Sequence, residues 1–361
     1  MINVKVIGAG SIGNHLTQAA RRMGWNVVVV DNDPDALNRM KNDIYPSRYG
    51  KWDSEIELYD STNEPQGNFD LICIGTPPDV RMDIAMSVLQ EKPQIILLEK
   101  PLCTPSLEGL NRFLSEYDSQ DDTVALVGYN YGVAESTSFV VSLLDSNSIG
   151  SIQIIDVEFR EHWQGILDAH PWLNGPEDSY LGYFEKGGGA GCEHSHALHL
   201  WQIFANHGGL GKWKQVDCCM EMNSRGMAFY DSIAAFQFVT DQGKLGRVVQ
   251  DVITLPVKKR AFIQGEHGYI EWLCNGHVEG DIVCFDTLED GPNEKIFRKN
   301  RQDEFYWEML HINDIMKKKI SSSASPISLE SGVAVMKVLS SAYNNRNNGK
   351  TIPEFNSNDE K

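Results

Sequence analysis

The chain has 361 residues, of which 41% are hydrophobic and 23% charged, a composition typical of a globular protein long enough for two domains. Its formal net charge of −18 argues against partners that are themselves polyanions, such as nucleic acids and anionic membranes, and no apolar run approaches the roughly 18 residues of a membrane span. The strand-like start MINVKVIGAG leaves no room for a signal peptide, and the seven cysteines lack CxxC spacing, so we expect a cytoplasmic protein with reduced thiols.

A glycine turn near the start is the first stretch with chemical meaning. Residues 2–7 alternate as a short strand, and apolar residues from 12 to 23 recur at helical spacing. The turn between them, GAGSIG, would let a pyrophosphate approach bare backbone at the positive end of a helix. The residues predicted to bind a dinucleotide here are Gly8, Gly10, Ser11, Ile12 and Gly13.

A second strand, residues 26–30, ends on Asp31, about 20 residues after the glycines, where a carboxylate would bind the adenosine ribose hydroxyls. The segment DNDP is also a natural turn, and both interpretations can hold together. A 2′-phosphate beside Asp31 and Asp33 would be repelled, and no arginine stands at positions 32–35 to offset this. The cofactor is therefore expected to be NAD rather than NADP.

Further strands and helices alternate along the first 130 residues, which predicts a doubly wound parallel sheet with right-handed crossovers. Residues 45–68 are interpreted as a polar connection of variable appearance. The expected strands and helices after it are strand 69–74, helix 80–89, strand 95–99, helix 106–117 and strand 124–127.

Polar residues follow the ends of these strands, and in open α/β sheets ligands bind outside the carboxyl ends of the strands. The expected cofactor contacts here are Thr76, Pro77, Glu99, Lys100 and Asn130. Lys100 comes directly after the buried run IILLE, so its ammonium would be held at the crevice together with Asn130 and Tyr131 as substrate contacts. The alternative is a lysine whose head group reaches solvent at a strand end.

The motifs GAGSIG, GTPP, EKP and GYN occur in the order and approximate spacing of the Gfo/Idh/MocA oxidoreductases, the family of glucose-fructose oxidoreductase and inositol dehydrogenase, which this chain resembles. The resemblance runs over essentially the whole chain and is strongest over residues 1–131. It implies that Lys100 contacts both the substrate hydroxyl and the nicotinamide. Many relatives carry histidine downstream of GTPP where this chain has Arg81, a departure whose effect we expect to be confined to the cofactor's surroundings.

The resemblance also implies an α/β fold with two domains. A Rossmann NAD-binding domain would span residues 1–128, and a substrate-binding α/β domain with a large open, mostly antiparallel sheet would span 129–325. A C-terminal helix within 326–350 would return to the Rossmann side. The polar tail 355–361 is expected to be disordered.

A histidine-rich segment, AGCEHSHALHLWQIFA, is the second candidate for chemistry. On one continuous helix, Cys192, His196 and His199 would form a stripe facing the crevice, while His194 and Trp201 would lie on the packing side. The histidines could instead be hydrogen-bonded core residues. A zinc site is the other alternative, but spacing commits no further ligand, and we expect no metal.

The resemblance favours a catalytic role in this segment. Family members follow a glycine run with a helix that bears an acid and, about one turn later, a catalytic histidine or tyrosine. This implies that His196 is catalytic, with Glu193 the nearer candidate for its acid partner, and that His199 stands where the family has aspartate. Cys192, His196 and His199 are accordingly expected to contact the substrate.

Other segments of the second half are less specific. Residues 151–163 alternate as a strand covered on one face, and residues 215–239 and 247–272 are expected to be strands of a large sheet. The loop 170–180 is rich in carboxylates and aromatic residues and supplies Trp172 as a candidate sugar contact, although it could be an ordinary connection. Residues 328–343 are predicted to form a final helix.

These observations predict an NAD-dependent oxidoreductase that transfers a hydride between nicotinamide and a secondary hydroxyl or keto group of a sugar, sugar nucleotide or cyclitol. Two alternatives stay open: a redox-neutral glycosidase that uses NAD, and a non-catalytic dinucleotide-binding regulator. The expected partner is a carbohydrate-like small molecule, with neither nucleic acid nor membrane. An open sheet face needing cover predicts a homodimer or homotetramer.

Overall fold

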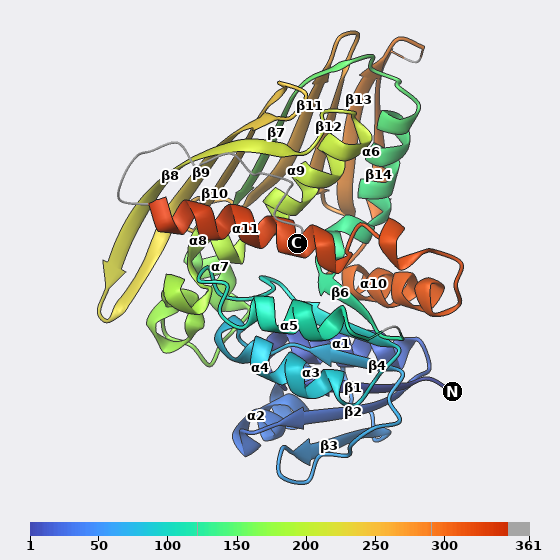
Figure 1. Ribbon diagram of the computed structural model, residues 1–361, viewed down its shortest axis with the longest axis vertical. Coiled ribbons are helices and arrows are strands. Elements are labelled where there is room, and N and C mark those ends of the chain that lie inside the picture. Colours follow the sequence, from blue (N-terminus) through green and yellow to red (C-terminus); the bar gives the residue numbers. More distant parts are fainter. Residues whose placement is uncertain (121, 290, 346–361) are drawn as a thin grey trace. The chain divides into compact units, whose positions relative to one another are not determined.

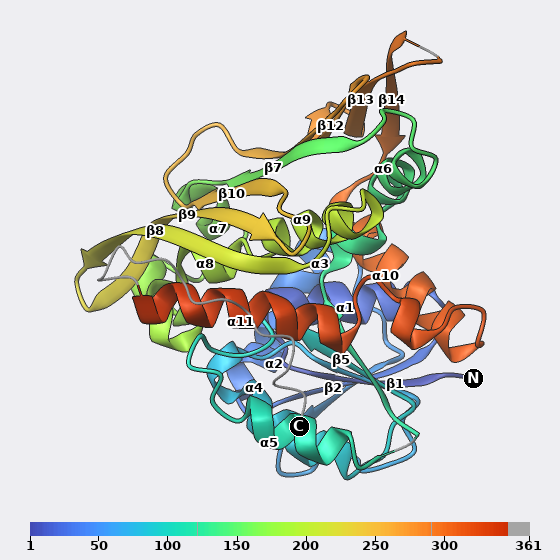
Figure 2. The ribbon, with the colours of Figure 1, turned by 45° about the horizontal axis from the view of Figure 1, so that its top comes forward.

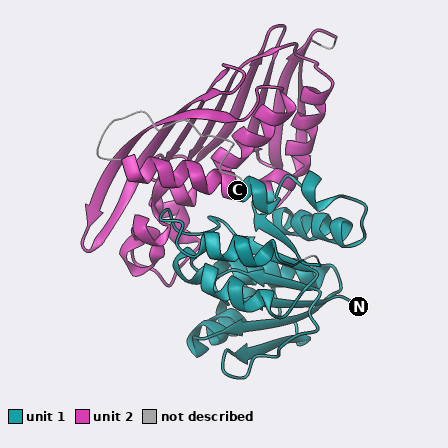
Figure 3. Ribbon diagram, viewed as in Figure 1, with its two compact units in different colours: residues 1–130, 301–332 teal, residues 131–300, 333–361 magenta. Residues whose placement is uncertain are grey.

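The computed structural model describes residues 1–120, 122–289 and 291–345, and the chain divides into two compact units (Figure 3). The first unit contains Met1–Asn130 and Arg301–Gly332. The second contains Tyr131–Asn300 and the chain from Val333 onward. This division differs from the expected domain boundary at 325, because residues 301–325 join the first unit.

Within the described residues, the first unit is built on a six-stranded sheet of order β3-β2-β1-β4-β5-β6, and every pairing is parallel (Figure 1). The strands are β1 (Asn3–Ile7), β2 (Asn26–Asp31), β3 (Ile56–Asp60), β4 (Leu71–Ile74), β5 (Ile95–Glu99) and β6 (Val124–Gly128). All residues of β4 and β5 are buried, as expected for central strands covered on both faces. This confirms the predicted doubly wound parallel sheet.

The helices of the first unit follow the predicted alternation, with local differences. They are α1 (Ser11–Arg22), α2 (Pro34–Arg39), the π-helical turn η1 (Met40–Ile44), α3 (Tyr45–Tyr49), α4 (Pro78–Leu89), α5 (Leu110–Tyr117), α10 (Arg301–Met316) and η6 (Ser322–Ala324). The short turn η2 (Asn130–Val133) begins at the last residue of the first segment of this unit and continues in the second unit. The segment 45–68, interpreted as a connection, contains α3 and the edge strand β3. Only Ile56 of β3 is buried, so the strand lacks the apolar pattern by which buried strands are recognised.

The helix α10 packs on α1, although the two are almost 300 residues apart in the chain. The ring of Phe305 stacks on His15 at 4.5 Å between centroids, and Arg22 is 2.6 Å from Asp303. Helix α11 (Leu329–Asn345), predicted as residues 328–343, begins in the first unit and continues in the second. The tail predicted at 355–361 lies outside the described residues.

The described part of the second unit is built on an eight-stranded sheet of order β14-β13-β12-β11-β7-β10-β9-β8. Only the pair β7 and β10 is parallel among the described pairings, which confirms the predicted mostly antiparallel sheet. Its strands are β7 (Ile152–Arg160), β8 (Trp213–Arg225), β9 (Ala228–Thr240), β10 (Leu245–Asp251), β11 (Lys258–Gly265), β12 (Tyr269–His277), β13 (Gly280–Thr287) and β14 (Gly291–Arg298).

The helices of this unit lie against one face of the sheet (Figure 2). They are α6 (Glu135–Asp145), α7 (Trp163–Asp168), the short turns η3 (Pro176–Asp178), η4 (Tyr180–Gly182) and η5 (Phe184–Lys186), α8 (Gly189–Glu193) and α9 (His196–His207). Trp201 of α9 is 1% exposed, and its indole N–H donates to the carbonyl of Ile155 at 3.0 Å. Trp201 thus anchors α9 on the strand β7, the packing role that the sequence predicted.

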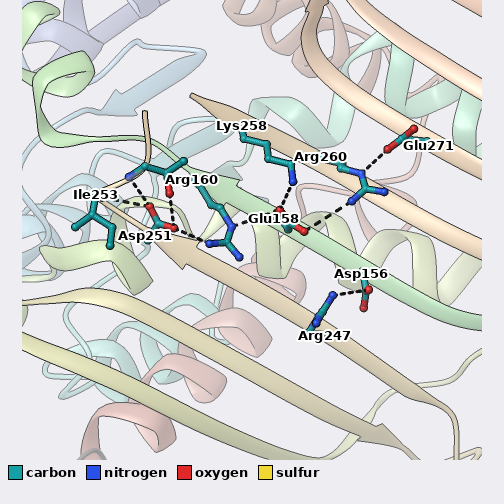
Figure 4. A network of polar contacts seen from close by, with 10 residues as sticks. Asp156, Glu158, Arg160, Arg247, Asp251, Ile253, Lys258, Arg260 and Glu271 are labelled. Carbon is teal, nitrogen blue, oxygen red and sulfur yellow. Dashed lines mark hydrogen bonds and ion pairs between the residues drawn. The ribbon is translucent and has the colours of Figure 1, made fainter. Parts of the chain in front are cut away.

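Within the described part of the chain, the opposite face of the sheet carries charged residues and no helix. In β7, Ile155, Val157 and Phe159 are buried, whereas the alternating residues Asp156, Glu158 and Arg160 form ion pairs with neighbouring strands (Figure 4). The closest of these pairs joins Arg247 to Asp156 at 2.8 Å. No helix among the described residues has the length and apolar character needed to span a membrane.

Candidate active site

The glycine turn closes tightly between β1 and α1. A Cβ added at Gly13 would lie 1.8 Å from the carbonyl oxygen of Gly8, so helix and strand approach each other more closely than any side chain allows. Gly8 has a φ of +106°, and an added Cβ would be 3.2 Å from the backbone of Gly75. At Gly10 an added Cβ would meet nothing within 4 Å among the described residues. The turn therefore presents open backbone on one side, as the cofactor hypothesis requires.

Asp31 stands at the end of β2 and connects two turns. One carboxylate oxygen accepts the backbone N–H of Ala9 at 2.7 Å, and the other accepts that of Asp33 at 2.9 Å. The two interpretations of this segment are therefore structurally compatible. Arg39, which lies outside the window considered in the sequence, is 3.2 Å from the carboxylate of Asp33.

A basic residue that the sequence analysis missed also contacts the glycine turn. Arg48 of α3 donates to the carbonyl oxygen of Ser11 at 3.1 Å and to its hydroxyl at 2.9 Å. Burial lowers the pKa of Arg48, and the positive charge of Arg301 adds to this. Ile12 follows in the first turn of α1 and is half-buried. No sequence motif pointed to Arg48, because it reaches the turn from a segment interpreted as a loop.

Arg81 links the ends of β4 and β5. Its side chain is 1% exposed and donates to the carbonyl oxygens of Thr76, Glu99 (2.6 Å) and Pro101. A planar guanidinium can serve several acceptors in fixed directions, which a histidine cannot do. The effect of Arg81 thus extends beyond the cofactor's surroundings, because it also holds the backbone on both sides of Lys100.

Glu99 is buried and turns toward the neighbouring strand. An added Cβ at Gly128 would be 2.7 Å from a carboxylate oxygen of Glu99, and the backbone N–H of Lys100 donates to the other oxygen at 3.2 Å. Burial raises the pKa of Glu99, while the charges of Arg81 and Lys100 oppose that shift. Lys100 itself is half-buried directly after the strand end.

Two polar atoms near the strand ends are buried without a hydrogen-bond partner among the described residues. They are the hydroxyl of Thr76 and the side-chain carbonyl oxygen of Asn130. Buried polar atoms are almost always satisfied in folded proteins, so these two atoms are suited to a bound ligand. Pro77, the third residue of GTPP, is exposed.

The histidine-rich segment is two helices, which corrects the predicted continuous helix. Helix α8 ends at Glu193, the residues His194 and Ser195 form a turn, and His196 begins α9. The side chain of Gln250 donates to the backbone carbonyls of His194 and, at 3.4 Å, Gly191, which occupies acceptors at the break. The stripe calculated at a constant helical pitch therefore does not exist as one face.

His196 lies among aromatic rings of the second unit. Its ring meets that of Tyr131 edge to face at 4.8 Å between centroids, and Phe159 lies 6.4 Å away. The ammonium of Lys299 also lies 5.4 Å from the ring centre of Tyr131, and it pairs with buried Asp281 at 2.9 Å. The ion pair was not predicted, because neither residue belongs to a recognisable motif.

Two members of the predicted stripe are fully buried. His199 and Cys192 are both 0% exposed, and an added Cβ at Gly132 would be 2.7 Å from the ring of His199. Neither side chain is therefore exposed in the described structure, which favours the alternative core position for His199. Glu193 is half-buried at the end of α8.

Trp172 is half-buried and meets the ring of His170 edge to face at 5.3 Å, a contact within its own loop. Among the described residues, no group of three or more His, Cys, Asp and Glu side chains is placed to hold a metal ion.

Behind α8, Asp231 of β9 is fully buried and joins the glycine run to α11. Its carboxylate accepts the backbone N–H of Gly191 at 2.7 Å and the hydroxyl of Tyr343 at 2.6 Å. Burial raises the pKa of Asp231 to about 7, although both hydrogen bonds oppose the shift. Asp231 thus fixes the start of the segment that leads to His196.

Comparison with known proteins gives results for both sequence and fold. Residues 2–129 match the family model described as "Oxidoreductase family, NAD-binding Rossmann fold", GFO_IDH_MocA. No curated protein matches the sequence. Similar solved structures include levoglucosan dehydrogenase with NADH and levoglucosan, whose 15% identity extends over 98% of this chain and 99% of that chain, with a TM-score of 0.77.

Two further structures share the fold. The aldose-aldose oxidoreductase from Caulobacter crescentus with glycerol has 13% identity over 98% of this chain and 99% of that chain, with a TM-score of 0.75. An oxidoreductase from Agrobacterium radiobacter with NAD+, L-tartaric acid and magnesium has 16% identity over 98% of both chains, with a TM-score of 0.74. At these identities the likeness shows a common fold. Together with the glycine turn and the matched sequence, it confirms the resemblance, and residues 2–129 are an NAD-binding Rossmann domain of the Gfo/Idh/MocA oxidoreductase family.

Proposed function

We propose that this chain is an NAD-dependent dehydrogenase that acts on a secondary hydroxyl or keto group of a sugar, sugar nucleotide or cyclitol. The observation that supports it best is the end of β5. There an NAD-binding Rossmann domain carries Lys100 on a backbone that Arg81 holds from both sides. A lysine that served only solubility would need no such support. The names of the similar structures, a levoglucosan dehydrogenase and an aldose-aldose oxidoreductase, favour a carbohydrate-like substrate.

The residues that would hold the cofactor belong to the first unit. The open backbone at Gly10 and the first turn of α1 suit the diphosphate, and the carboxylate of Asp31 suits the adenosine ribose. The unsatisfied hydroxyl of Thr76 and amide oxygen of Asn130 are available to polar groups of the ligand. When bound, nicotinamide supplies the hydride acceptor or donor. NAD is preferred over NADP in this proposal because Asp31 and Asp33 would repel a 2′-phosphate.

Lys100 and His196 have separate roles in the proposal. The ammonium of Lys100 stabilises the negative charge that develops on the substrate oxygen, which is typically worth about 3 kcal/mol in a water-excluded site. The imidazole of His196 takes the proton of the hydroxyl, directly or through water, and a positioned base contributes a factor of about 10² to 10⁴. Glu193 is its candidate acid partner. Asn130, Tyr131 and Trp172 remain the candidate substrate contacts, whereas the complete burial of Cys192 and His199 favours core positions for these two side chains.

A screen of NAD reduction tests the proposal. The purified protein is incubated with NAD and a panel of sugars, cyclitols and nucleotide sugars, and NADH is followed by absorbance. We expect NADH to accumulate in proportion to one class of substrate. Sugar hydrolysis without net NADH would favour a redox-neutral glycosidase, and NAD binding without any turnover across the panel would favour a regulator.

A homo-oligomer is part of the same proposal. The sheet face with Asp156, Glu158 and Arg160 has no helix over it among the described residues, and a second copy would cover it. Because this face is charged, assembly through it should weaken at high salt. Light scattering at micromolar concentration should give a dimer or tetramer, and a strict monomer at low salt would contradict this part.

A further inference from the structure

An arginine at the first turn of α1 has no role in the function proposed above. The guanidinium of Arg48, on α3, donates to the backbone carbonyl oxygen of Ser11 at 3.1 Å and to its hydroxyl at 2.9 Å. Ser11 is the first residue of α1 and belongs to the glycine turn GAGSIG. Two hydrogen bonds from one planar group fix both the place of the positive charge and the direction of the serine side chain.

This positive charge lies at the end of the helix where it is least favourable. The amino end of a helix is its positive end, so acidic side chains stabilise it and basic side chains oppose it. Helix α1 has 12 residues and no acidic residue in its first turn, and its N-cap residue, Gly10, supplies no side-chain acceptor. Burial and the charge of Arg301 also lower the pKa of Arg48. An anion bound at this place would offset the repulsion.

The segment that carries Arg48 is fixed independently of its guanidinium. The side chain of Gln302, on α10, donates to the backbone carbonyl of Arg48 at 3.1 Å. The hydroxyl of Tyr49 forms a hydrogen bond of 2.6 Å with His15 of α1, and His15 in turn stacks on Phe305. Because α1 and α10 both hold this end of α3, loss of the guanidinium should leave the backbone of α3 in place.

The contact with Arg48 also decides what the hydroxyl of Ser11 can donate to. A serine hydroxyl has one proton to donate and lone pairs with which to accept. Because the oxygen accepts an N–H of Arg48, its own proton points away from the guanidinium. The neighbouring backbone at Gly10 is open, since an added Cβ there would meet nothing within 4 Å among the described residues. The hydroxyl proton and the first N–H groups of α1 are thus available to the same anion.

We propose that Arg48 is a positioning residue for the diphosphate of NAD. It directs the hydroxyl proton of Ser11 toward the diphosphate and places a positive charge beside that anion. Arg48 therefore contributes to holding the cofactor and not to the transfer of the hydride. The inference rests on one part of the proposed function, namely that the diphosphate lies at the first turn of α1, and it can be tested without a substrate.

Titration calorimetry with NAD on Arg48→Met is the first experiment, because this change removes the charge and both donors. We expect the Kd of NAD to rise about thirtyfold at about 50 mM NaCl, and clearly less at about 300 mM, where salt screens the charge. The unfolding midpoint of the protein without NAD should change little. A Kd within twofold of the unmodified protein would overturn the proposal. An equal rise at both salt concentrations would also overturn it, because Arg48 would then act only through local structure.

Arg22 provides the matched control, because it lies at the opposite end of α1 and its loss changes the net charge equally. It pairs with Asp303 at 2.6 Å, and its guanidinium carbon lies 3.9 Å from the ring centre of Tyr306. Arg22→Met should lower the unfolding midpoint and leave the Kd of NAD within about twofold. If Arg48→Met does not fold, Arg48→Lys decides. An ammonium keeps the charge without the planar pair of donors, so the Kd should rise only about fivefold, and an unchanged Kd would overturn the proposal.

The second experiment tests whether Arg48 acts through Ser11. Ser11→Ala alone should raise the Kd of NAD about tenfold. In the double variant with Arg48→Met, the rise should be well below the product of the two single rises, because part of the effect of Arg48 needs the hydroxyl. A rise equal to that product would remove the positioning role. If the unmodified protein binds no NAD, the proposed function fails together with this inference, whereas NAD binding that is unaffected by Arg48→Met contradicts this inference alone.

Discussion

The two candidate catalytic residues are held in place by different physical means. Lys100 follows a strand whose end is held by hydrogen bonds from one buried side chain, Arg81, to backbone carbonyls. His196 begins a helix that is placed by packing, between the rings of Tyr131 and Phe159. A single substitution can remove hydrogen bonds that hold a strand end, whereas a helix held by packing loses its position gradually as its contacts are changed.

The packing that places α9 also depends on one buried polar residue, Asp231. Asp231 is enclosed so closely by the glycine run that an added Cβ at Gly189 would be 1.9 Å from its carboxylate. Its partners, Gly191 and Tyr343, are neutral donors, in contrast to the cation that pairs with Asp281. The stability of the segment that leads to His196 should therefore depend on pH. The end of β5 should instead be sensitive to changes in the charge and donor geometry of Arg81.

The largest expected effect concerns Asp231. Its pKa of about 7 in the folded protein lies above the usual 3.8, so the folded state retains a proton that the unfolded state loses. Stability from this residue is greatest at low pH, falls as pH rises from about 4 to 7, and is then constant, a difference of about 4 kcal/mol. Asp231→Asn should remove this part of the pH dependence in calorimetric unfolding.

A control for this prediction is Asp251, which is equally buried but pairs with Arg160 at 3.1 Å. Asp251→Asn should lower the free energy of unfolding at every pH. The difference in that free energy between pH 8 and pH 5 should stay nearly the same. If the difference in unfolding free energy between pH 8 and pH 5 is the same in Asp231→Asn as in the unmodified protein, the carboxylate of Asp231 is ionised in the folded state.

The next effect is that of Lys100→Met, which keeps the bulk of the side chain and removes its charge. With a substrate from the screen, kcat/KM should fall at least a hundredfold, or about 3 kcal/mol of transition-state stabilisation. NAD binding and the unfolding midpoint should change little. Lys100→Arg should fail as well, since a planar guanidinium cannot occupy the same point as the compact ammonium.

Exposed Lys41 serves as the comparison for surface charge, and Lys41→Met should be fully active. Near-normal turnover in both Lys100 variants would make EKP a structural strand end and would return the function to the alternatives.

Arg81→Lys tests the hydrogen bonds by which Arg81 holds the ends of β4 and β5. The charge remains, but an ammonium cannot reach three carbonyls from one planar group, so at least one buried acceptor loses its donor. We expect a loss of about 2 kcal/mol in urea unfolding, together with a lower kcat. If stability falls while kcat is unchanged, the hydrogen bonds of Arg81 support the strand ends without positioning Lys100.

The smallest effect is expected at Asp31. Removing its carboxylate takes away the proposed ribose contact and the hydrogen bond to Ala9, and both are remote from the reacting atoms. Asp31→Ala should raise the Kd of NAD about tenfold, or about 1.4 kcal/mol, with kcat at saturation nearly unchanged. Calorimetric titration with NAD and NADP checks this. A preference of the unmodified protein for NADP would contradict the assignment of Asp31.

Much of the first unit could be predicted because its signals are local. Continuous apolar runs such as IILLE mark buried parallel strands, and glycines or prolines mark where they end, so the residues at the carboxyl edge could be named in advance. The edge strand β3 was missed for the same reason, since a strand with a single buried residue has no such run.

The sequence by itself thus determined the parallel sheet, its ligand edge and the candidate residues along it, because strand period and turn chemistry depend on adjacent residues. Only the tertiary structure decided which polar side chains are buried and by what. The break before His196 depends on Gln250, the burial of His199 on Gly132, and the position of the glycine run on Asp231. Each of these relationships joins residues far apart in the chain, and a carboxyl or imidazole acquires its chemistry from the dielectric and donors that such distant neighbours create around it.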